Sequence, residues 1–228
     1  MNKELEFLER LMCEIVEEGA KTPKAQVERY LSPILSIFLE EILNKSDILT
    51  GTYEMIAPEF PIRKGTIAEI TNEVLTRPNQ STNIDYLLLN KDGNKNKFSF
   101  IELKTDPKSF KPSQLEIYNN LEKVCNTNTK VFGEILYEDL EIIKTKSSYK
   151  KKYNYLLQNK WRAEYNEIDK MEIVYIVPAE TKLKDSDPSL KVIYFDDIDK
   201  ILKGHHYASQ WKTIVKYLVK LDSKPIYD

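Results

Sequence analysis

Three charged residues interrupt two neighbouring apolar segments of this 228-residue chain. Asp85 lies near the start of Ile84–Asn90 (IDYLLLN), and Glu102 and Lys104 lie at the end of Lys97–Lys104 (KFSFIELK). A strand with one solvated face alternates regularly between apolar and polar residues, whereas these two segments carry apolar residues on both faces. Charges in such segments therefore indicate chemistry rather than simple solvation.

The sequence between the two segments predicts a β-hairpin that brings the charges together. The connection reads KDGNKN, in which Asp92-Gly93 is a typical turn dipeptide. A turn centred between Gly93 and Asn94 pairs residues whose numbers sum to about 187. In this register Asp85 lies opposite Glu102, as a cross-strand pair.

The same register makes further pairs that a structure can check. It places Leu87 opposite Phe100 and Leu89 opposite Phe98. Because strand side chains alternate between faces, Glu102 and Lys104 should share the face of Asp85. A slip of one residue would separate these charges, so the argument depends on the turn.

The three residue types suit metal-assisted hydrolysis of a phosphodiester. Two carboxylates buried side by side are costly unless a cation neutralises them. A hard cation such as Mg²⁺, or Mn²⁺, accepts one or two carboxylates together with water and phosphate oxygens. The Lys104 ammonium beside them would stabilise charge on the reacting phosphate or keep the attacking water reactive.

The alternative is a structural role for the same residues. Glu-x-Lys arises easily in a chain with 34 basic and 36 acidic residues. Cross-strand Glu–Lys pairs are also common on solvated sheets, where they form surface salt bridges. The apolar surroundings of Asp85, Glu102 and Lys104 favour the functional interpretation.

The motif spacing resembles that of the PD-(D/E)XK nuclease superfamily. Ile84-Asp85 is followed, at a hairpin's reach, by Ile101-Glu102-Leu103-Lys104, although Ile84 stands where the motif usually has Pro. Downstream, Gln114-Leu115-Glu116-Ile117-Tyr118 resembles the QxxxY motif of the RecB-type exonuclease branch. The resemblance covers residues 84–118 well, and the flanks match it only in the order of helices and strands.

This resemblance implies a restriction-endonuclease-like fold and a set of roles. It implies that Asp85, Glu102 and the backbone carbonyl of Leu103 are metal ligands and that Lys104 is catalytic. The expected function is a Mg²⁺- or Mn²⁺-dependent deoxyribonuclease that binds DNA. RecB-type relatives with an iron–sulfur cluster need four cysteines, whereas this chain has two, so that cluster is excluded.

The segment after the hairpin supports a site at a helix start. Ser113 and Glu116 form a Ser-x-x-Glu capping box, which predicts a helix over about 113–124. Gln114 and Tyr118 are four residues apart and share a face of that helix. They would position the nucleic-acid strand or orient Lys104. Alternatively, Gln114 is solvated and Tyr118 packs in the core.

An upstream helical glutamate often completes the metal site in this superfamily. Glu28 is our choice, because it lies beside an apolar helical stripe and can turn inward. A glutamate on such a border is also commonly solvated. The competing candidates are Glu17, Glu18, Glu40, Glu41 and Glu59.

Residues 144–162 (KTKSSYKKKYNYLLQNKWR) form a local basic segment. Lys150, Lys151 and Lys152 are predicted to contact nucleic-acid phosphates, and the interleaved aromatic side chains can stack on unpaired bases. The alternative is a solvated helix whose tyrosines pack inward, which we favour slightly for the aromatic residues. The adjacent His205-His206 lacks the spacing of a metal site and is predicted to lie in a loop.

Composition limits the remaining classes. The net charge of −2 confines any nucleic-acid surface to a local patch, and 41% hydrophobic residues can form a sizeable core. No apolar run approaches the roughly 18 residues of a membrane span, and the start of the chain lacks the apolar region of a signal peptide. We therefore expect a cytoplasmic protein without a membrane partner; the oligomeric state, including a homodimer, stays open.

The order of predicted elements indicates an α/β domain with a mixed sheet. Residues 3–18 should form an amphipathic helix, and a longer one should begin at Pro23 with Thr22 as its N-cap. Pro33 lies inside this second helix and should kink it. Strands are expected over 53–62 (an edge or irregular strand), the hairpin, 171–177 and 191–195, and helices over about 197–203 and 208–221. Residues 66–75 fit either a strand or a short helix.

We expect one nuclease-like domain over 1–228, with N-terminal helices over 1–45, the nuclease core over 53–178 and a C-terminal strand and helices over 179–228. Two other functions are compatible with this organisation. One is a nucleic-acid-binding protein on a catalytically degenerate nuclease fold, and the other is a non-enzymatic interaction domain.

Overall fold

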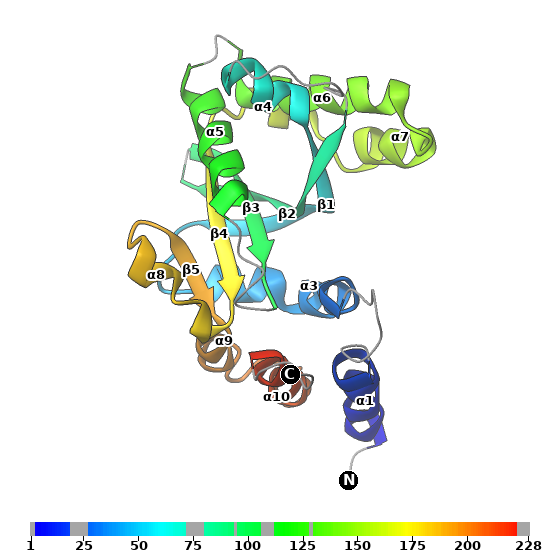
Figure 1. Ribbon diagram of the computed structural model, residues 1–228, viewed down its shortest axis with the longest axis vertical. Coiled ribbons are helices and arrows are strands. Elements are labelled where there is room, and N and C mark those ends of the chain that lie inside the picture. Colours follow the sequence, from blue (N-terminus) through cyan, green and yellow to red (C-terminus); the bar gives the residue numbers. More distant parts are fainter. Residues whose placement is uncertain are drawn as a thin grey trace. The chain divides into compact units, whose positions relative to one another are not determined.

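A computed structural model of the chain describes residues 3–18, 27–71, 80–93, 95–105, 112–127 and 130–222. The chain divides into two compact units (Figure 1). Unit 1 comprises Met1–Thr50, Leu103–Phe110 and Val174–Asp228, and unit 2 comprises Gly51–Glu102 and Lys111–Ile173.

The strands form a five-stranded mixed sheet in the order β1-β2-β3-β4-β5. β1 pairs with β2 and β2 with β3 in antiparallel fashion, whereas β4 and β5 are parallel. The predicted α/β class with a mixed sheet is therefore confirmed. The strands are β1 (Thr52–Arg63), β2 (Ser81–Asp92), β3 (Lys95–Leu103), β4 (Met171–Val177) and β5 (Lys191–Tyr194).

Helices separate and flank these strands. The N-terminal helix ends in a π-helical turn, and residues 66–75, which fitted either state, begin within a helix. No helix in the described ranges is long and apolar enough to cross a membrane. The helical elements are α1 (Lys3–Cys13), η1 (Glu14–Glu18), α3 (Val27–Lys45), α4 (Lys64–Thr71), α5 (Pro112–Thr127), α6 (Phe132–Lys146), α7 (Lys150–Asn159), η3 (Ala163–Glu167), η4 (Ala179–Thr181), α8 (Leu183–Ser186), α9 (Phe195–Ile201) and α10 (Ala208–Asp222).

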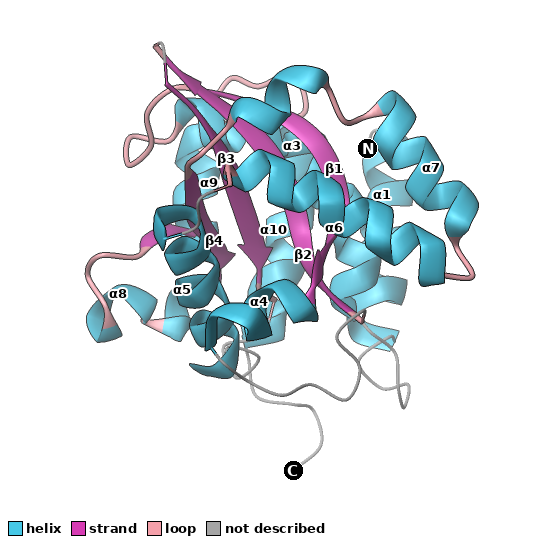
Figure 2. Ribbon diagram, turned by 90° about the horizontal axis from the view of Figure 1, so that it is seen from above, coloured by secondary structure: helices cyan, strands magenta, loops and turns pink. Residues whose placement is uncertain are grey.

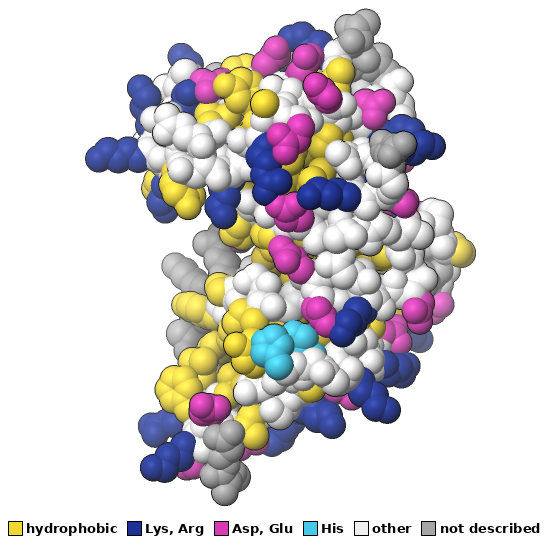
Figure 3. Space-filling view, turned by 180° about the vertical axis from the view of Figure 1, so that it is seen from behind, with side chains coloured by type: hydrophobic (Ala, Val, Ile, Leu, Met, Phe, Trp, Pro, Cys, Tyr) yellow, Lys and Arg dark blue, Asp and Glu magenta, His cyan; other side chains and the backbone are white. Residues whose placement is uncertain are grey.

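Unit 1 is built on the amphipathic stripe of α3. Phe38 is buried, and its ring lies 5.5 Å from that of Trp211 on α10, measured between centroids. The His205-His206 pair lies in the turn between α9 and α10, as predicted, and is seen in cyan in Figure 3. The other buried stripe residues of α3 are Leu31, Leu35, Leu39 and Ile42.

Unit 2 has an aromatic core beneath β1–β3. Phe98 of β3 lies 6.1 Å from Phe132 of α6 and 5.8 Å from Trp161, between ring centroids. Helix α6 crosses this face of the strands, with α7 beside it (Figure 2). Phe98 and Phe100 point to the same face because strand side chains alternate, so this face of β3 carries the core.

β1 is an edge strand, as its two prolines predict, because it ends the strand order. Pro58 and Pro61 pair with Tyr86 and Asn83 within this ladder. The strand is irregular at two points, a register shift between Met55 and Ala57 and a left-handed Glu59 with φ of 49°.

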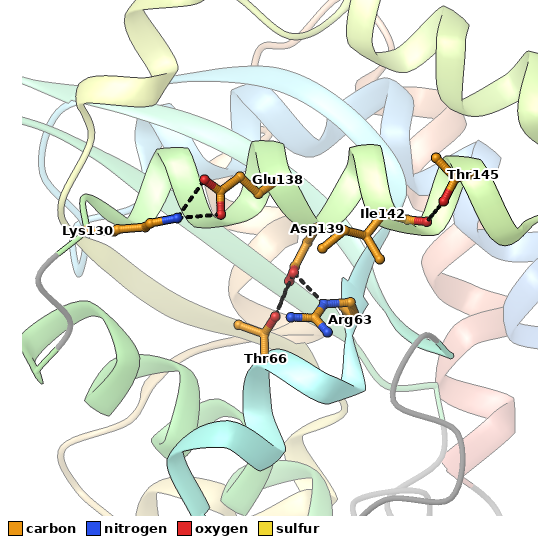
Figure 4. A network of polar contacts seen from close by, with 7 residues as sticks. All are labelled: Arg63, Thr66, Lys130, Glu138, Asp139, Ile142 and Thr145. Atoms are coloured by element: carbon orange, nitrogen blue, oxygen red, sulfur yellow. Dashed lines mark hydrogen bonds and ion pairs between the residues drawn. The ribbon is translucent and has the colours of Figure 1, made fainter.

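A buried polar cluster fixes the end of β1 to α6 and α4. The Asp139 carboxylate of α6 accepts hydrogen bonds from Arg63 Nε at 2.7 Å and from Thr66 Oγ1 at 2.6 Å (Figure 4). Burial raises the pKa of the Asp139 carboxyl, and the hydrogen bonds from Thr66 and Arg63 oppose that shift. The cluster gives the buried Asp139 and Thr66 side chains hydrogen-bond partners in this part of the core.

Replacement of Asp139 by alanine should destabilise the protein by about 2 kcal/mol, because it removes the charged acceptor of two buried donors. Urea unfolding of wild type and variant measures this difference. Glu138→Ala is the matched control: Glu138 precedes Asp139 on the same helix but forms an exposed ion pair with Lys130, so its loss should change little. Equal stability of the two variants would contradict a stabilising role for the Asp139 hydrogen bonds.

Candidate active site

The hairpin of β2 and β3 has the register predicted from its turn. Leu87 pairs with Phe100 and Leu89 with Phe98, and the ladder runs from Asp92↔Lys95 to Tyr86↔Ile101. Gly93 has a φ of 61°, the left-handed conformation that a turn glycine adopts readily. Asp85 and Glu102 are the next pair in this register, and both project on the face that carries Phe98 and Phe100.

Glu102 is deeply buried beneath α5. Its side chain is 2% exposed, and the hydroxyl of Tyr118 donates a hydrogen bond to Glu102 Oε2. Tyr118 is itself buried, so the QxxxY-like helix contacts the carboxylate of the hairpin directly. Asp85, in contrast, is only half-buried. One carboxylate of the pair is therefore held in a fixed environment while the other retains contact with solvent.

Helix α5 begins at Pro112, one residue before the predicted start. The capping-box interpretation of Ser113 was therefore wrong in position: Ser113 lies inside the first turn, and Pro112 takes the first helical place that proline favours. Gln114 lies in the same first turn, and its side chain is outside the described part of the chain. The predicted role of Gln114 stays a prediction.

Leu103 ends β3 and Lys104 follows it. Lys104 is buried, with 5% of its surface exposed, and its backbone N–H donates to the carbonyl of Ile176 at 3.0 Å. Leu103 and Lys104 belong to unit 1, whereas Asp85 and Glu102 belong to unit 2. The shared face of Lys104 and Asp85 therefore stays a prediction.

The candidate upstream glutamates differ in position and in exposure. Glu28 lies in the first turn of α3, and its side chain, like those of Glu17 and Glu18, is outside the described residues. Glu40 is exposed, and Glu41 forms an ion pair with Lys45 in its own helix.

Glu59 has a distinct position among these candidates. It lies between the pairs Pro58↔Tyr86 and Phe60↔Ile84, which puts it beside Asp85 in register. Its side chain is exposed and accepts a hydrogen bond from Asn83 Nδ2 at 3.3 Å.

The basic segment forms α7 and the loops around it. Lys150, Lys151 and Lys152 occupy the first turn of α7 and are exposed. The slight preference for inward-packing tyrosines was wrong for Tyr149 and Tyr155, whose side chains are 62% and 58% exposed. The reason is that α7 packs only lightly and has no buried residue. Trp161 does pack inward, against Phe60 and Phe98.

The opposite face of the same hairpin holds a buried carboxylate that sequence analysis missed. Glu172 of β4 accepts hydrogen bonds from Asn90 Nδ2 at 2.7 Å, Ser99 Oγ at 2.6 Å and Tyr53 Oη at 3.0 Å. Lys97 Nζ lies 2.9 Å from its second oxygen. Burial and the nearby Glu172 charge raise the pKa of the Tyr53 hydroxyl, which therefore stays a donor. The sequence feature that could have predicted this buried carboxylate is the single charge of Glu172 inside the apolar run MEIVYIV.

The residues of the candidate site fit a hard cation by their donor chemistry. Asp85 and Glu102 supply carboxylate oxygens, which Mg²⁺ and Mn²⁺ prefer, and neither Cys13 nor Cys125 is part of the hairpin. Among the described residues, no group of three or more His, Cys, Asp or Glu side chains could hold a metal ion. The expected site has two carboxylates and one backbone carbonyl as ligands, so it is not a group of three such side chains.

No family model, curated protein or solved structure gave a significant match to this chain. The fold itself defines an α/β protein with a five-stranded mixed sheet. The superfamily resemblance of the hairpin motifs stays a prediction from residues 84–118.

Proposed function

We propose that this chain is a metal-dependent deoxyribonuclease of the PD-(D/E)XK kind. The observation that carries the proposal is the burial of Glu102 in β3 and of Lys104 directly after it, in a hairpin whose register, continued by one pair beyond Tyr86↔Ile101, puts Glu102 opposite Asp85. Buried charges are retained at a cost, and functional sites are one place where proteins accept that cost. The same burial argues against a surface salt-bridge cluster.

Asp85 and Glu102 would hold Mg²⁺ or Mn²⁺ together with the carbonyl of Leu103. A bound divalent cation supplies polarisation of the scissile phosphate and a more acidic water. The hydroxyl of Tyr118 fixes the Glu102 carboxylate by its hydrogen bond, which orients a ligand before any metal arrives. Lys104 stabilises negative charge that develops at the phosphate or on the attacking water.

Gln114, Glu28 and the lysines of α7 have supporting roles in this proposal. Gln114 positions the nucleic-acid strand from the first turn of α5, and Glu28 completes the metal site from α3. Lys150, Lys151 and Lys152 neutralise phosphates away from the point of cleavage, because lysines on an exposed helix bind a polyanion without reading its sequence.

The experiment is a cleavage assay on single- and double-stranded DNA with Mg²⁺, with Mn²⁺ and with a chelator. Cleavage that needs the metal and stops with the chelator supports the proposal. Binding of DNA without any cleavage would instead support the nucleic-acid-binding protein on a degenerate fold. Absence of both binding and cleavage would contradict the proposal and favour an interaction domain.

Replacing Lys150, Lys151 and Lys152 together by alanine should weaken DNA binding and flatten its dependence on salt. Each phosphate contact on single-stranded DNA contributes about 0.7 to the slope of log affinity against log salt, so the slope should fall by up to about 2. Fluorescence anisotropy over a salt series measures this slope. The control is a triple alanine variant of the exposed Lys200, Lys203 and Lys212. Equal slopes in the two variants would contradict a role of α7 in DNA binding and favour a solvated helix face.

A further inference from the structure

Helix α7 presents aromatic and basic side chains together on its solvent face. Lys151 and Lys152 lie four and three residues before Tyr155, so all three share one side of the helix. Tyr155 is 58% exposed and both lysines are exposed. Tyr149, at the N-cap, extends this face, because Lys152 Nζ lies 5.2 Å from the centre of its ring. These four residues are called the α7 face below.

The α7 face lies in the most basic part of the chain. Residues 144–162 contain seven lysines and arginines and no acidic residue, whereas the whole chain has a net charge of −2. In the described part of the chain, neither Lys151 nor Lys152 forms an ion pair with an acidic side chain. Positive charge in the first turn of a helix is also unfavourable to that helix. The first turn of α7 therefore presents positive charge to solvent, which suits a polyanionic partner.

The exposed tyrosines distinguish among polyanions. Large aromatic side chains usually bury most of their surface, as Trp161 and Tyr165 do in this unit. Tyrosines exposed beside lysines offer ring faces to flat partners, and unpaired bases are such partners. Figure 3 shows Lys and Arg side chains projecting beside hydrophobic ones at the upper left, where α7 lies in that view.

The apolar side of α7 argues against a membrane surface. Leu156 and Leu157 are half-buried, and α7 contacts α6. The solvent face is consequently basic and aromatic, without the broad aliphatic surface that an interfacial helix inserts into lipid.

We infer that the α7 face binds single-stranded nucleic acid, with the rings of Tyr155 and Tyr149 stacking on unpaired bases and Lys151 and Lys152 contacting phosphates. This inference rests on the proposed nuclease function for the identity of the polymer and adds the state in which the polymer is held. A duplex buries its base faces by stacking, so it can engage the lysines but not the rings.

The test measures binding of the full chain to labelled polythymidine by fluorescence anisotropy, with a chelator present so that no cleavage occurs. Tyr155→Ala should weaken this binding about tenfold, the scale of one lost base–aromatic stack. Tyr155→Phe should bind like wild type, because stacking needs the ring and not the hydroxyl. Tyr30→Ala, at a tyrosine of α3 that is 56% exposed, is the matched control and should have no effect.

Two further probes separate the contribution of bases from that of charge. An abasic oligonucleotide of equal length should bind more weakly than polythymidine and should not distinguish Tyr155→Ala from wild type. A DNA duplex should likewise not distinguish them. Wild-type affinity of Tyr155→Ala for polythymidine, or an equal loss on the abasic strand, would overturn the inference.

Binding to phosphatidylserine vesicles that exceeds binding to polythymidine would also overturn the inference, in favour of a membrane surface. Because every measurement is made without metal, a failure here is distinct from a failure of the proposed nuclease. If the chain cleaves DNA but its affinity for polythymidine does not depend on Tyr155, only the inference about the α7 face is contradicted. If the chain never cleaves DNA but Tyr155→Ala weakens polythymidine binding, only the proposed nuclease activity is contradicted.

Discussion

Replacing Lys104 by alanine is expected to lower the single-turnover rate of DNA cleavage by about a hundredfold or more, the scale of one lost preorganised donor at a developing charge. The reason is that the proposed site uses the ammonium of Lys104, which is buried directly after β3, to stabilise charge that would form in the transition state rather than in the bound substrate. DNA affinity should change little, because one phosphate contact among several contributes a small part of binding.

Single-turnover kinetics of purified variants, with circular dichroism to confirm folding, measures this effect. Lys104→Met keeps most of the side-chain volume and removes only the charge, so it serves if the alanine variant unfolds. Lys95→Ala, at the exposed start of the same strand, is the matched control and should cleave like wild type. If folded Lys104→Ala also cleaves like wild type, the nuclease assignment fails at its centre.

Replacing Glu102 by alanine should abolish metal binding and metal-dependent cleavage together. Glu102 is the buried member of the carboxylate pair, and removing one of two carboxylates leaves too few charged oxygen ligands for a hard cation. Calorimetry with Mg²⁺ or Mn²⁺ should give weak binding to wild type and none to the variant.

Glu102→Gln is the second variant for this position. It keeps an oxygen that can accept from Tyr118 and therefore preserves the local packing, while it removes the charge. Glu122→Ala, exposed on the same helix as Tyr118, is the control for loss of a carboxylate elsewhere in unit 2. Unchanged metal binding by both Glu102 variants would place the ligands at other residues.

The hairpin was predictable because its determinants are local. Asp92-Gly93 specifies the turn, the turn specifies the register, and period-2 alternation then assigns each side chain to a face. The edge position of β1 followed in the same way from Pro58 and Pro61. Elements of this kind depend on residues close in sequence, so the chain alone determines them.

The buried polar clusters were not predictable, because their members are distant in the sequence. Asp139 meets Arg63 across 76 residues, and Glu172 meets Tyr53 across 119. Nothing near either acid indicates its partner, although Glu172 is marked as the single charge inside the apolar run Met171–Val177. A charge inside an apolar run also led to the prediction of Glu102 as a site residue. The sequence can therefore predict that a charged residue is buried, but its role becomes clear only when its partners are known.

The sequence alone also did not predict which side chains of α7 face solvent. Tyr149 and Tyr155 have the apolar character of core residues, and helical spacing alone does not say which side of a short helix faces its neighbour. The contact between α7 and α6 decides this, and it leaves both rings in solvent. Tertiary packing, rather than helix propensity, thus determines which residues can meet a ligand.

The most direct test of the central claim is single-turnover cleavage of DNA by wild type, Lys104→Ala and Glu102→Gln, prepared identically and assayed with Mg²⁺ and with a chelator. The proposed site predicts cleavage by wild type only when Mg²⁺ is present, and loss of that cleavage in both folded variants. Cleavage by wild type in the chelator, or equal cleavage by all three proteins in Mg²⁺, would contradict a metal-dependent active site at the end of β3.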